Sequence, residues 1–442
     1  MSANLTASLP GTNQRITVID TLRGIALLGM MIVHFSYNGT YEKTGVNGII
    51  VKVNQWLIDG RFFTMFAILF GVGFAIQLEN AKRKGVNFVP RYLRRLAMLL
   101  FFGILVESLC GFNILVEYSI AGLVLLAVRN WSLKALVVFT LFIALLGTIY
   151  SFSFNTISVA RYGVERTKSM NQKRNLQSMA YWTKKRQLDS VARNTSSFST
   201  AVVFHTKSMI HRFTDVRMLI FAWLADPILF FLIGLISVKK GVFNNPKKHR
   251  WLIIGFMTFG LASWILFLRG KPLFSLTRNM QYPNVPYSID LILKYASYNL
   301  FYLLRYNWLT FTYIGAVLLM SAYIKKILQF RIFSSAGRMP LTFYFLQAFL
   351  ISLYYKKSAF GFPTYPDVLA PVFALLLFTA MVLFSRWWLA RYEYGPLEWL
   401  WRSVTYWKVQ PFRKSIKTLS FEAEPEGVIE VVTVPVQTTS TV

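Results

Sequence analysis

Ten long apolar stretches constrain this chain more than any other feature of its sequence. They lie at about residues 19–37, 61–79, 92–110, 113–129, 133–153, 217–238, 251–268, 306–324, 340–355 and 367–388. A helix needs about 20 mainly apolar residues to cross the roughly 30 Å hydrocarbon core of a bilayer. Backbone groups in lipid must find hydrogen bonds within their own segment, so we expect each stretch to be helical. The sequence therefore predicts an all-α, polytopic integral membrane protein with about ten transmembrane helices.

The composition agrees with burial in lipid and argues against other classes of protein. Hydrophobic residues make up 55% of the 442 residues and charged residues only 15%, whereas soluble domains carry about 25% charged residues. A net charge of +30 could indicate a nucleic-acid binder. Most basic residues lie between the apolar stretches, however, so topology explains the charge and we expect no nucleic-acid partner. The one cysteine, Cys110, and four histidines favour neither a disulfide framework nor a metal site.

The distribution of Lys and Arg predicts the orientation in the membrane. The most basic short connections follow the second, sixth and eighth stretches, and all lie on one side if the helices alternate in direction. The side rich in Lys and Arg faces the cytoplasm, so we expect both termini there. The predicted organisation is a cytoplasmic N-terminus (1–18), a transmembrane domain (19–410) and a cytoplasmic tail (411–442). The tail is acidic and then rich in Val and Thr, which favours disorder.

The segment 155–216 is the exception to this charge pattern. It contains 11 Lys and Arg residues and three acids, a net charge of +8, and the topology places it outside the cell as a basic extracytoplasmic loop. Connections of about 60 residues are largely exempt from the charge rule. Such a loop could hold an anionic glycan or lie on anionic lipid. Membrane lipid and an anionic cell-envelope glycan are therefore the expected partners, and the oligomeric state is left open.

Ionisable residues within the apolar stretches are the candidate functional groups, because they are costly to place in a membrane. The first stretch contains Asp20, Arg23 and His34. Eleven residues make almost three helical turns, so Arg23 and His34 share a face and lie roughly 16 Å apart. Arg23 is expected near the cytoplasmic end and His34 in the outer half. Alternatively, Asp20 and Arg23 are interfacial anchors and His34 is a satisfied buried histidine.

Two carboxylates are expected at a depth similar to that of His34. Glu107 lies late in the third stretch and Glu117 lies early in the fourth. A carboxylate beside an imidazole fixes its tautomer and raises its basicity. We hypothesise that His34 is a general base oriented by Glu107 or Glu117; alternatively, both carboxylates lie at the wet interface. Asp226 precedes Pro227 inside the sixth stretch, where it faces a polar cavity or marks a structural kink.

Six blocks of sequence resemble one known family and keep its order along nearly the whole chain. They lie at residues 19–29, 60–73, 94–96, 114–123, 337–347 and 395–402. The last two, GRMPLTFYFLQ and GPLEWLWR, are the most specific. Together the blocks resemble domain-of-unknown-function family 418, the YeiB-like membrane proteins.

This resemblance implies a function in acyl transfer. The family is similar to a wider set of membrane acyltransferases, which includes the acyltransferase 3 family and heparan-alpha-glucosaminide N-acetyltransferase. In the acyltransferase 3 pattern a histidine follows an arginine after ten intervening residues in the first helix, and Arg23 and His34 match that spacing. The resemblance implies an O- or N-acyltransferase of the bacterial cytoplasmic membrane. It would move an acyl group from cytoplasmic acyl-CoA to an acceptor such as a cell-envelope glycan. Acyl-CoA is then a co-substrate, and no tightly bound cofactor is expected.

The residues expected in this reaction form two groups. The predicted catalytic residues are His34, Glu107 and Glu117, and those expected along the substrate or donor path are Asp20, Arg23, Arg61, Arg94, Arg95, Asp226, Arg338, Tyr344 and Gln347. The family usually carries Asn at the position of His34, so the polar set of this chain differs from the usual pattern.

Two other functions use the same residues. A transporter or flippase of the cell envelope would use them as a proton relay or a substrate path, although no internal repeat is visible of the kind that many transporters contain. The third hypothesis is a non-catalytic partner in an envelope complex.

Overall fold

The described part of the chain is almost entirely helical in a computed structural model. The structure describes residues 17–36, 44–279, 306–324, 331–362 and 364–414. Within these ranges there is no strand, and β structure is confined to isolated bridges such as that between Tyr392 and Arg413. The all-α prediction is confirmed for these residues. Most of the predicted N-terminal segment (1–18) and of the predicted disordered tail (411–442) lies outside the described residues.

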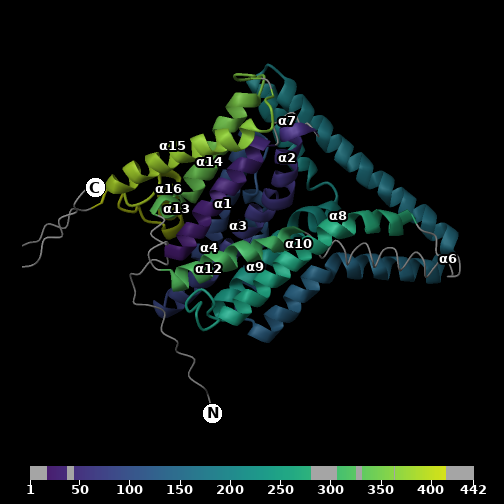
Figure 1. The fold of residues 1–442 in the computed structure, drawn as a ribbon, viewed down its shortest axis with the longest axis horizontal. Coiled ribbons are helices and arrows are strands. Elements are labelled where there is room, and N and C mark those ends of the chain that lie inside the picture. Colours follow the sequence, from purple (N-terminus) through teal and green to yellow (C-terminus); the bar gives the residue numbers. More distant parts are fainter. Residues whose placement is uncertain (1–16, 37–43, 280–305, 325–330, 363, 415–442) are drawn as a thin grey trace, which may run out of the picture.

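Each predicted apolar stretch coincides with a helix (Figure 1). The helices are α1 (Thr17–Ser36), α3 (Arg61–Arg83), α4 (Phe88–Cys110), α5 (Leu115–Ala127), α6 (Leu133–Asn194), α9 (Ala225–Lys239), α10 (Arg250–Asn279), α12 (Leu309–Tyr323), α14 (Pro340–Tyr355) and α15 (Leu369–Arg391). The remaining elements are α2 (Gly45–Val53), α7 (Phe198–His211), α8 (Val216–Met218), α13 (Arg331–Gly337), α16 (Pro396–Tyr406), the π-helical turns η1 (Asn54–Ile58) and η2 (Leu219–Leu224), and the 3-10 turn η3 (Tyr306–Trp308).

The outer surface of the helical bundle is apolar. Among the described residues, six helical stretches are long and apolar enough to cross a membrane, and α5, α12 and α14 are shorter apolar helices. Large side chains on the outside of these helices are exposed, such as Val138 on α6 (67%) and Leu376 on α15 (64%). A large exposed apolar surface marks contact with a membrane or another protein, and apolar helices of this length favour a membrane. The chain is therefore an integral membrane protein, and the count of ten crossings stays a prediction.

Helix α1 lies in the interior of the bundle, packed against α3, α13, α14 and α15. Two glycines permit its close approach to α13. A Cβ atom at Gly337 would lie 1.7 Å from the carbonyl oxygen of Asp20, and one at Gly24 would lie 2.0 Å from that of Phe333. Close backbone contact at small residues is a common way for helices to associate in membranes. We refer below to the two ends of α1 as the Arg23 end and the His34 end.

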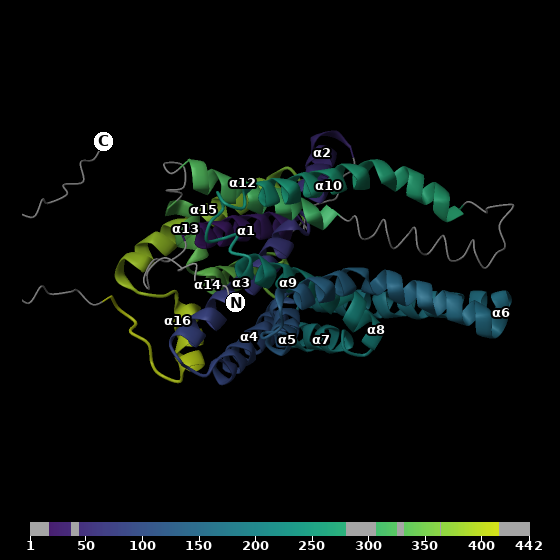
Figure 2. The same ribbon diagram turned by 90° about the horizontal axis from the view of Figure 1, so that it is seen from below.

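The segment 155–216 is largely helical, and its place outside the cell stays a prediction. Helix α6 continues from its apolar part through this segment to Asn194 and reverses direction at Gly163, whose φ of 76° and ψ of 173° favour glycine. Figures 1 and 2 show its two legs projecting beyond the bundle. The second leg is rich in Lys, Arg, Gln and Met, which are good helix formers. No membrane span was predicted in this segment, because it contains no long apolar stretch.

Helix α7 joins this projecting segment to the His34 end of the bundle. Gly111 ends α4 with a φ of 87°, and a Cβ atom there would lie 2.2 Å from the ring of His205 on α7. Helix α7 therefore packs closely against the end of α4. Whether this end faces the outside of the cell stays a prediction.

The two most specific sequence blocks meet at the start of α14. Glu398, on α16, accepts hydrogen bonds at Oε1 from the backbone N–H groups of Leu341 (2.6 Å) and Thr342 (3.0 Å). Its Oε2 accepts a bond from the hydroxyl of Thr342 (2.6 Å). Pro340 occupies the first turn of α14, where no backbone donor is needed. The carboxylate thus caps α14 from a distant helix, which is a structural reason for the two blocks to occur together.

Replacing Glu398 with alanine is expected to lower the free energy of unfolding by about 2 kcal/mol, because buried backbone donors of α14 lose a charged acceptor. Denaturant unfolding of the purified protein in detergent measures this change. Glu79→Ala, which removes an exposed carboxylate from α3, serves as the matched control. An equal effect of the two substitutions would show that the cap contributes nothing specific.

Candidate functional site

His34 is buried in an aromatic enclosure at one end of α1. His34 is only 6% exposed. The imidazole lies 4.7 Å from the ring of Phe112, 5.9 Å from that of Phe63 and 6.4 Å from that of Tyr344, measured between ring centroids. The side chain therefore points into the protein and away from lipid. Tyr344 is fixed in turn, because its Oη accepts a hydrogen bond from the backbone N–H of Ile114 (3.1 Å).

Gln347, on α14, lies beside the imidazole of His34. Its Nε2 lies 3.5 Å from Nδ1 of His34. Its Oε1 is buried without a hydrogen-bond partner among the described residues. The two ends of an amide are assigned from their surroundings. With the amide turned over, Oε1 would accept a bond from Nδ1–H, which would satisfy the oxygen and leave Nε2 of His34 as the basic nitrogen.

A small cavity of about 190 Å³ adjoins the same end of α1. Val33 and Ser36, on either side of His34 in the sequence, contribute to its wall, together with Asn54, Asp59 and Asp367. Asn54 Nδ2 donates a hydrogen bond to Ser36 Oγ (2.7 Å). The cavity is thus a polar space beside the turn of α1 that carries His34.

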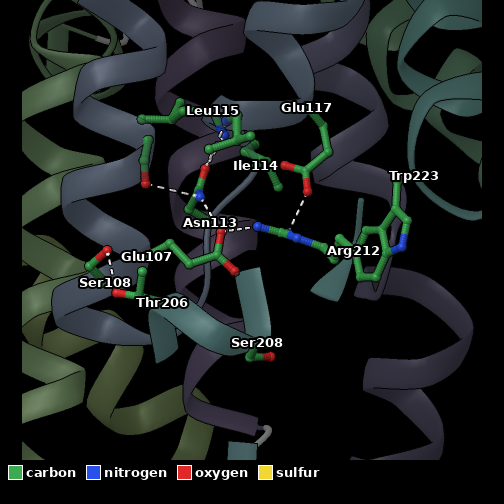
Figure 3. Close-up of polar contacts among 12 residues, drawn as sticks. Glu107, Ser108, Asn113, Ile114, Leu115, Glu117, Thr206, Ser208, Arg212 and Trp223 are labelled. Atoms are coloured by element: carbon green, nitrogen blue, oxygen red, sulfur yellow. Dashed lines mark hydrogen bonds and ion pairs between the residues drawn. The ribbon is translucent and has the colours of Figure 1, made fainter. Parts of the chain in front are cut away.

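Glu107 and Glu117 form a buried cluster with an arginine that was not predicted (Figure 3). Arg212, at the end of α7, is only 3% exposed. It donates a hydrogen bond from Nη2 to Oε2 of Glu107 and another from Nη1 to Oε1 of Glu117. Its guanidinium also lies over the ring of Trp223, 5.1 Å from the centroid. The pair of carboxylates therefore holds α7 against α4 and α5.

Asn113 completes this cluster in the turn between α4 and α5. Its Nδ2 donates to Oε2 of Glu107 (2.6 Å) and to the carbonyl oxygen of Gly103 (3.1 Å). Its Oδ1 accepts bonds from the backbone N–H groups of Leu115 and Val116, the second at 3.1 Å. The side chain therefore caps the first turn of α5 and positions Glu107 at the same time.

The hypothesis that Glu107 or Glu117 orients His34 is not supported by these contacts. The hydrogen bonds described for both carboxylates go to Arg212 and Asn113, while Gln347 lies beside the imidazole. Arg212 was missed because it belongs to the basic segment 155–216, where it is one of 11 Lys and Arg residues. Nothing in the local sequence distinguishes it from its exposed neighbours.

Arginines and aromatic rings gather at the Arg23 end of α1. Arg23 forms an ion pair with Asp20 (3.1 Å). Arg95, on α4, donates a hydrogen bond to Oε1 of Gln77 (2.7 Å), and its guanidinium lies 4.2 Å from the ring centroid of Trp401 on α16. Arg95 lies close enough to Arg23 to interact with its charge. These predicted donor-path residues are therefore brought together.

Two further predicted arginines lie at this end. Arg94 lies over the ring of Trp407, 5.7 Å from its centroid. Arg338 directly follows Gly337, which packs against the carbonyl of Asp20. Four of the predicted arginines thus lie on α1, on α4 and just after α13. The ring of Trp401 on α16 lies against Arg95, and the ring of Trp407, the residue after α16, lies against Arg94.

Arg61 and Asp226 lie elsewhere and have different surroundings. Arg61 is buried at the start of α3 and donates hydrogen bonds to the carbonyl oxygens of Gln55 (2.9 Å), Trp56 and Asp59, so it stabilises the turn that precedes the helix. Asp226 lies where the π-helical turn η2 meets α9, and it lines a cavity of about 510 Å³ beside α6. Both readings of Asp226, a group facing a polar cavity and the mark of a structural kink, stay predictions.

Two family models match separate parts of the chain. Residues 237–408 match a family described as "Protein of unknown function (DUF418)", and residues 15–173 match the catalytic model of heparan-alpha-glucosaminide N-acetyltransferase. The "Uncharacterized protein YxaH" of Bacillus subtilis (strain 168) is 26% identical over 428 residues, which cover 92% of this chain and 98% of that protein. The "Uncharacterized protein YeiB" of Escherichia coli (strain K12) is 23% identical over 428 residues, covering 89% and 96%. Along nearly its whole length the chain is therefore similar to the YeiB-like proteins, and its C-terminal part matches the DUF418 model.

No solved structure matches this chain. Its candidate site combines both matched regions. Arg23, Arg95 and His34 lie in the part that matches the N-acetyltransferase model, whereas Gln347 and Trp401 lie in the part that matches DUF418. The two matched regions of sequence therefore contribute to one arrangement of helices around α1.

Proposed function

We propose that this protein is a membrane acyltransferase that moves an acyl group, such as acetyl, from cytoplasmic acyl-CoA to an extracytoplasmic acceptor such as a cell-envelope glycan. The match of residues 15–173 to an N-acetyltransferase catalytic model carries the proposal. That part of the chain includes α1, with arginines at one end and a buried imidazole at the other. The relatives are bacterial, and we place the protein in the cytoplasmic membrane with the basic Arg23 end inside.

The arginines at the Arg23 end would bind the phosphate groups of acyl-CoA. Arginine is well suited to phosphate, because its planar guanidinium donates two parallel hydrogen bonds and keeps its charge. Arg94 and Arg95 lie beside Trp407 and Trp401, whose rings offer faces for an adenine base. The long, flexible pantetheine arm would extend along α1 toward His34.

His34 would act as the general base for the transfer. With Nδ1–H donating to Gln347, the Nε2 atom would take the proton from an acceptor hydroxyl or amine. The acceptor oxygen or nitrogen would form a bond to the acyl carbon, and the carbon–sulfur bond of the thioester would break. The imidazolium would then return the proton to the CoA thiolate. The products are the acylated acceptor and free CoA, so atoms and charge balance.

The cavity beside the His34 end would admit the acceptor. Its wall carries Asp59, Asp367 and Asn54, which can bind hydroxyl or amino groups. Buried aromatic rings around His34 would exclude water, and water would otherwise compete with the acceptor for the acyl group.

Purified protein in liposomes tests the proposal with radiolabelled acetyl-CoA on one side of the membrane and methyl glucosaminide or methyl glucoside on the other. We expect labelled acceptor to form, and only when acetyl-CoA has access to the Arg23 end. Labelled N-acetyl product indicates an amine acceptor, and labelled O-acetyl product a hydroxyl acceptor. Passage of unmodified acceptor across the membrane without acetylation would overturn the proposal in favour of transport.

A further inference from the structure

A second, larger cavity lies between α6 and α9, separate from the turn of α1 that carries His34. Its volume is about 510 Å³, within the range of roughly 300–1,000 Å³ that is usual for small-molecule sites. Both legs of α6 contribute to the wall, together with η2, the start of α9 and η3. The two legs of α6 therefore form much of the cavity wall.

Side-chain amides make up one part of the wall. Asn155 and Asn171 come from opposite legs of α6, and Asn171 Nδ2 donates a hydrogen bond to Asn155 Oδ1 (2.9 Å). Asn175 is exposed to the cavity, and Asn307 brings an amide from the other side. The Oδ1 atom of Asn307 is buried and has no hydrogen-bond partner among the described residues. A buried unpaired acceptor is costly, so this atom indicates a ligand that donates a hydrogen bond.

Aromatic rings make up a second part of the wall. Tyr150, Trp182, Phe221 and Trp308 all line the cavity. Tyr150 and Phe221 are packed against each other with their centroids 4.9 Å apart, so these rings are held in place. Rings of this kind offer a flat apolar surface next to polar groups. A sugar ring has the matching chemistry, with C–H bonds on its faces and hydroxyl groups around its edge.

The charges in the wall are matched by neighbouring groups. Arg217 pairs with Asp215 (3.1 Å), and Asp226 adds a negative charge to the wall. The guanidinium of Arg174 lies over the ring of Phe154, 3.7 Å from the centroid, and donates to the hydroxyl of Tyr150. An anionic glycan was predicted from the net charge of the whole segment 155–216. Within the cavity, the balance of charges suits a neutral, hydroxyl-rich ligand better.

The opposite part of the cavity is apolar. Along the first leg of α6 the cavity wall changes from apolar to polar. Ile143 and Gly147 line it in the apolar part of the helix, and Asn155 lines it further on. Leu229 and Phe230 of α9 continue the apolar part. A ligand that fills both parts has a polar head and an apolar tail.

We propose that this cavity binds the neutral sugar headgroup of a glycolipid. The amides would bind the hydroxyl groups, the aromatic rings would pack against the faces of the sugar, and the apolar part would hold the beginning of the lipid chain. A free saccharide shares the headgroup chemistry, and the experiment below distinguishes the two sources. The inference goes beyond the proposed acyl transfer and does not depend on it.

Gly147 offers a way to fill the cavity without disturbing the protein. A Cβ atom there meets no other atom within 4 Å, and the residue lies within helix α6. Gly147→Leu would therefore place a side chain in the cavity. Gly255→Leu is the matched control, because Gly255 on α10 also has open space and does not line the cavity. Asn175→Ala removes an exposed amide from the wall and leaves the helix intact.

The test is native mass spectrometry of the full chain in a polyoxyethylene detergent, which contains no sugar. The added probes are diglucosyl diacylglycerol, phosphatidylglycerol and methyl glucoside. We expect diglucosyl diacylglycerol to be retained, and its apparent affinity to fall about tenfold in Gly147→Leu and by a smaller factor in Asn175→Ala. Gly255→Leu should bind like the unmodified protein. Thermal unfolding of each variant checks that it is folded.

Each outcome bears directly on the proposal. Retention of methyl glucoside as tightly as the glycolipid would support a sugar site and assign it to a free saccharide. Equal retention of phosphatidylglycerol would overturn the sugar assignment. Glycolipid binding that is unchanged in both Gly147→Leu and Asn175→Ala would overturn the location. The acetyl-transfer assay does not depend on any of these results, so either proposal can be disproved without the other.

Discussion

Replacing His34 with alanine is expected to lower the rate of acyl transfer by about 10²- to 10⁴-fold, the usual contribution of a positioned general base. In the proposed reaction the imidazole of His34 takes the proton from the acceptor. The labelled acetyl-CoA assay in liposomes measures the change. Because alanine leaves a cavity among the rings of Phe63, Phe112 and Tyr344, His34→Gln is needed as a second variant that keeps most of the volume.

His249→Ala is the matched control, because His249 lies in the connection between α9 and α10 and should leave transfer unchanged. Gln347→Leu should reduce transfer less than His34→Ala and shift its pH profile, since Gln347 positions the imidazole without touching the acyl group. Glu107→Gln should retain more activity than Gln347→Leu. Folded His34→Gln protein with full activity would exclude His34 as the base.

Replacing Arg212 with methionine is expected to lower the free energy of unfolding by about 3–5 kcal/mol, the usual cost of removing one partner from a buried ion pair. The substitution keeps a long apolar side chain beside Trp223 and removes only the charge and its donors. It would leave Glu107 and Glu117 buried without their shared guanidinium. Denaturant unfolding in detergent measures the loss.

A combined variant separates the charge effect from a packing effect. Adding Glu107→Gln and Glu117→Gln to Arg212→Met removes the buried negative charges, so most of the lost stability should return. Arg186→Met, on the exposed face of the second leg of α6, is expected to change stability by less than about 0.5 kcal/mol. If the triple variant is as unstable as the sum of its single changes, the three residues do not act as a unit.

The candidate site shows which interactions can be predicted from sequence. The shared face of Arg23 and His34 followed from the helical repeat, and the structure places both on α1. The partners of His34 could not be derived in the same way. Gln347 lies 313 positions away along the chain, and only the family resemblance included it among the candidates. Glu107 and Glu117 were proposed as partners of His34 because of their expected depth in the membrane. The sequence did not indicate that Arg212 would bind both carboxylates.

The basic segment 155–216 shows the same limit for secondary structure. Membrane spans are recognised by long apolar stretches, and this segment contains none. Its helix-forming residues were consistent with a helix, but only the packing of its second leg and α7 against the bundle decided the arrangement. The reversal at Gly163 then brings Asn171 back to Asn155 and creates the larger cavity.

The sequence by itself determined that the protein is helical and embedded in lipid. Both properties depend on the local density and spacing of apolar residues, which each segment carries independently of the others. Only the tertiary structure decided that Arg212 joins Glu107 and Glu117, from 105 and 95 positions away. Charge pairing inside a membrane depends on which helices pack together, and that choice rests on contacts between residues far apart in the chain. The function of the polar residues therefore became interpretable only when the helices were placed around α1.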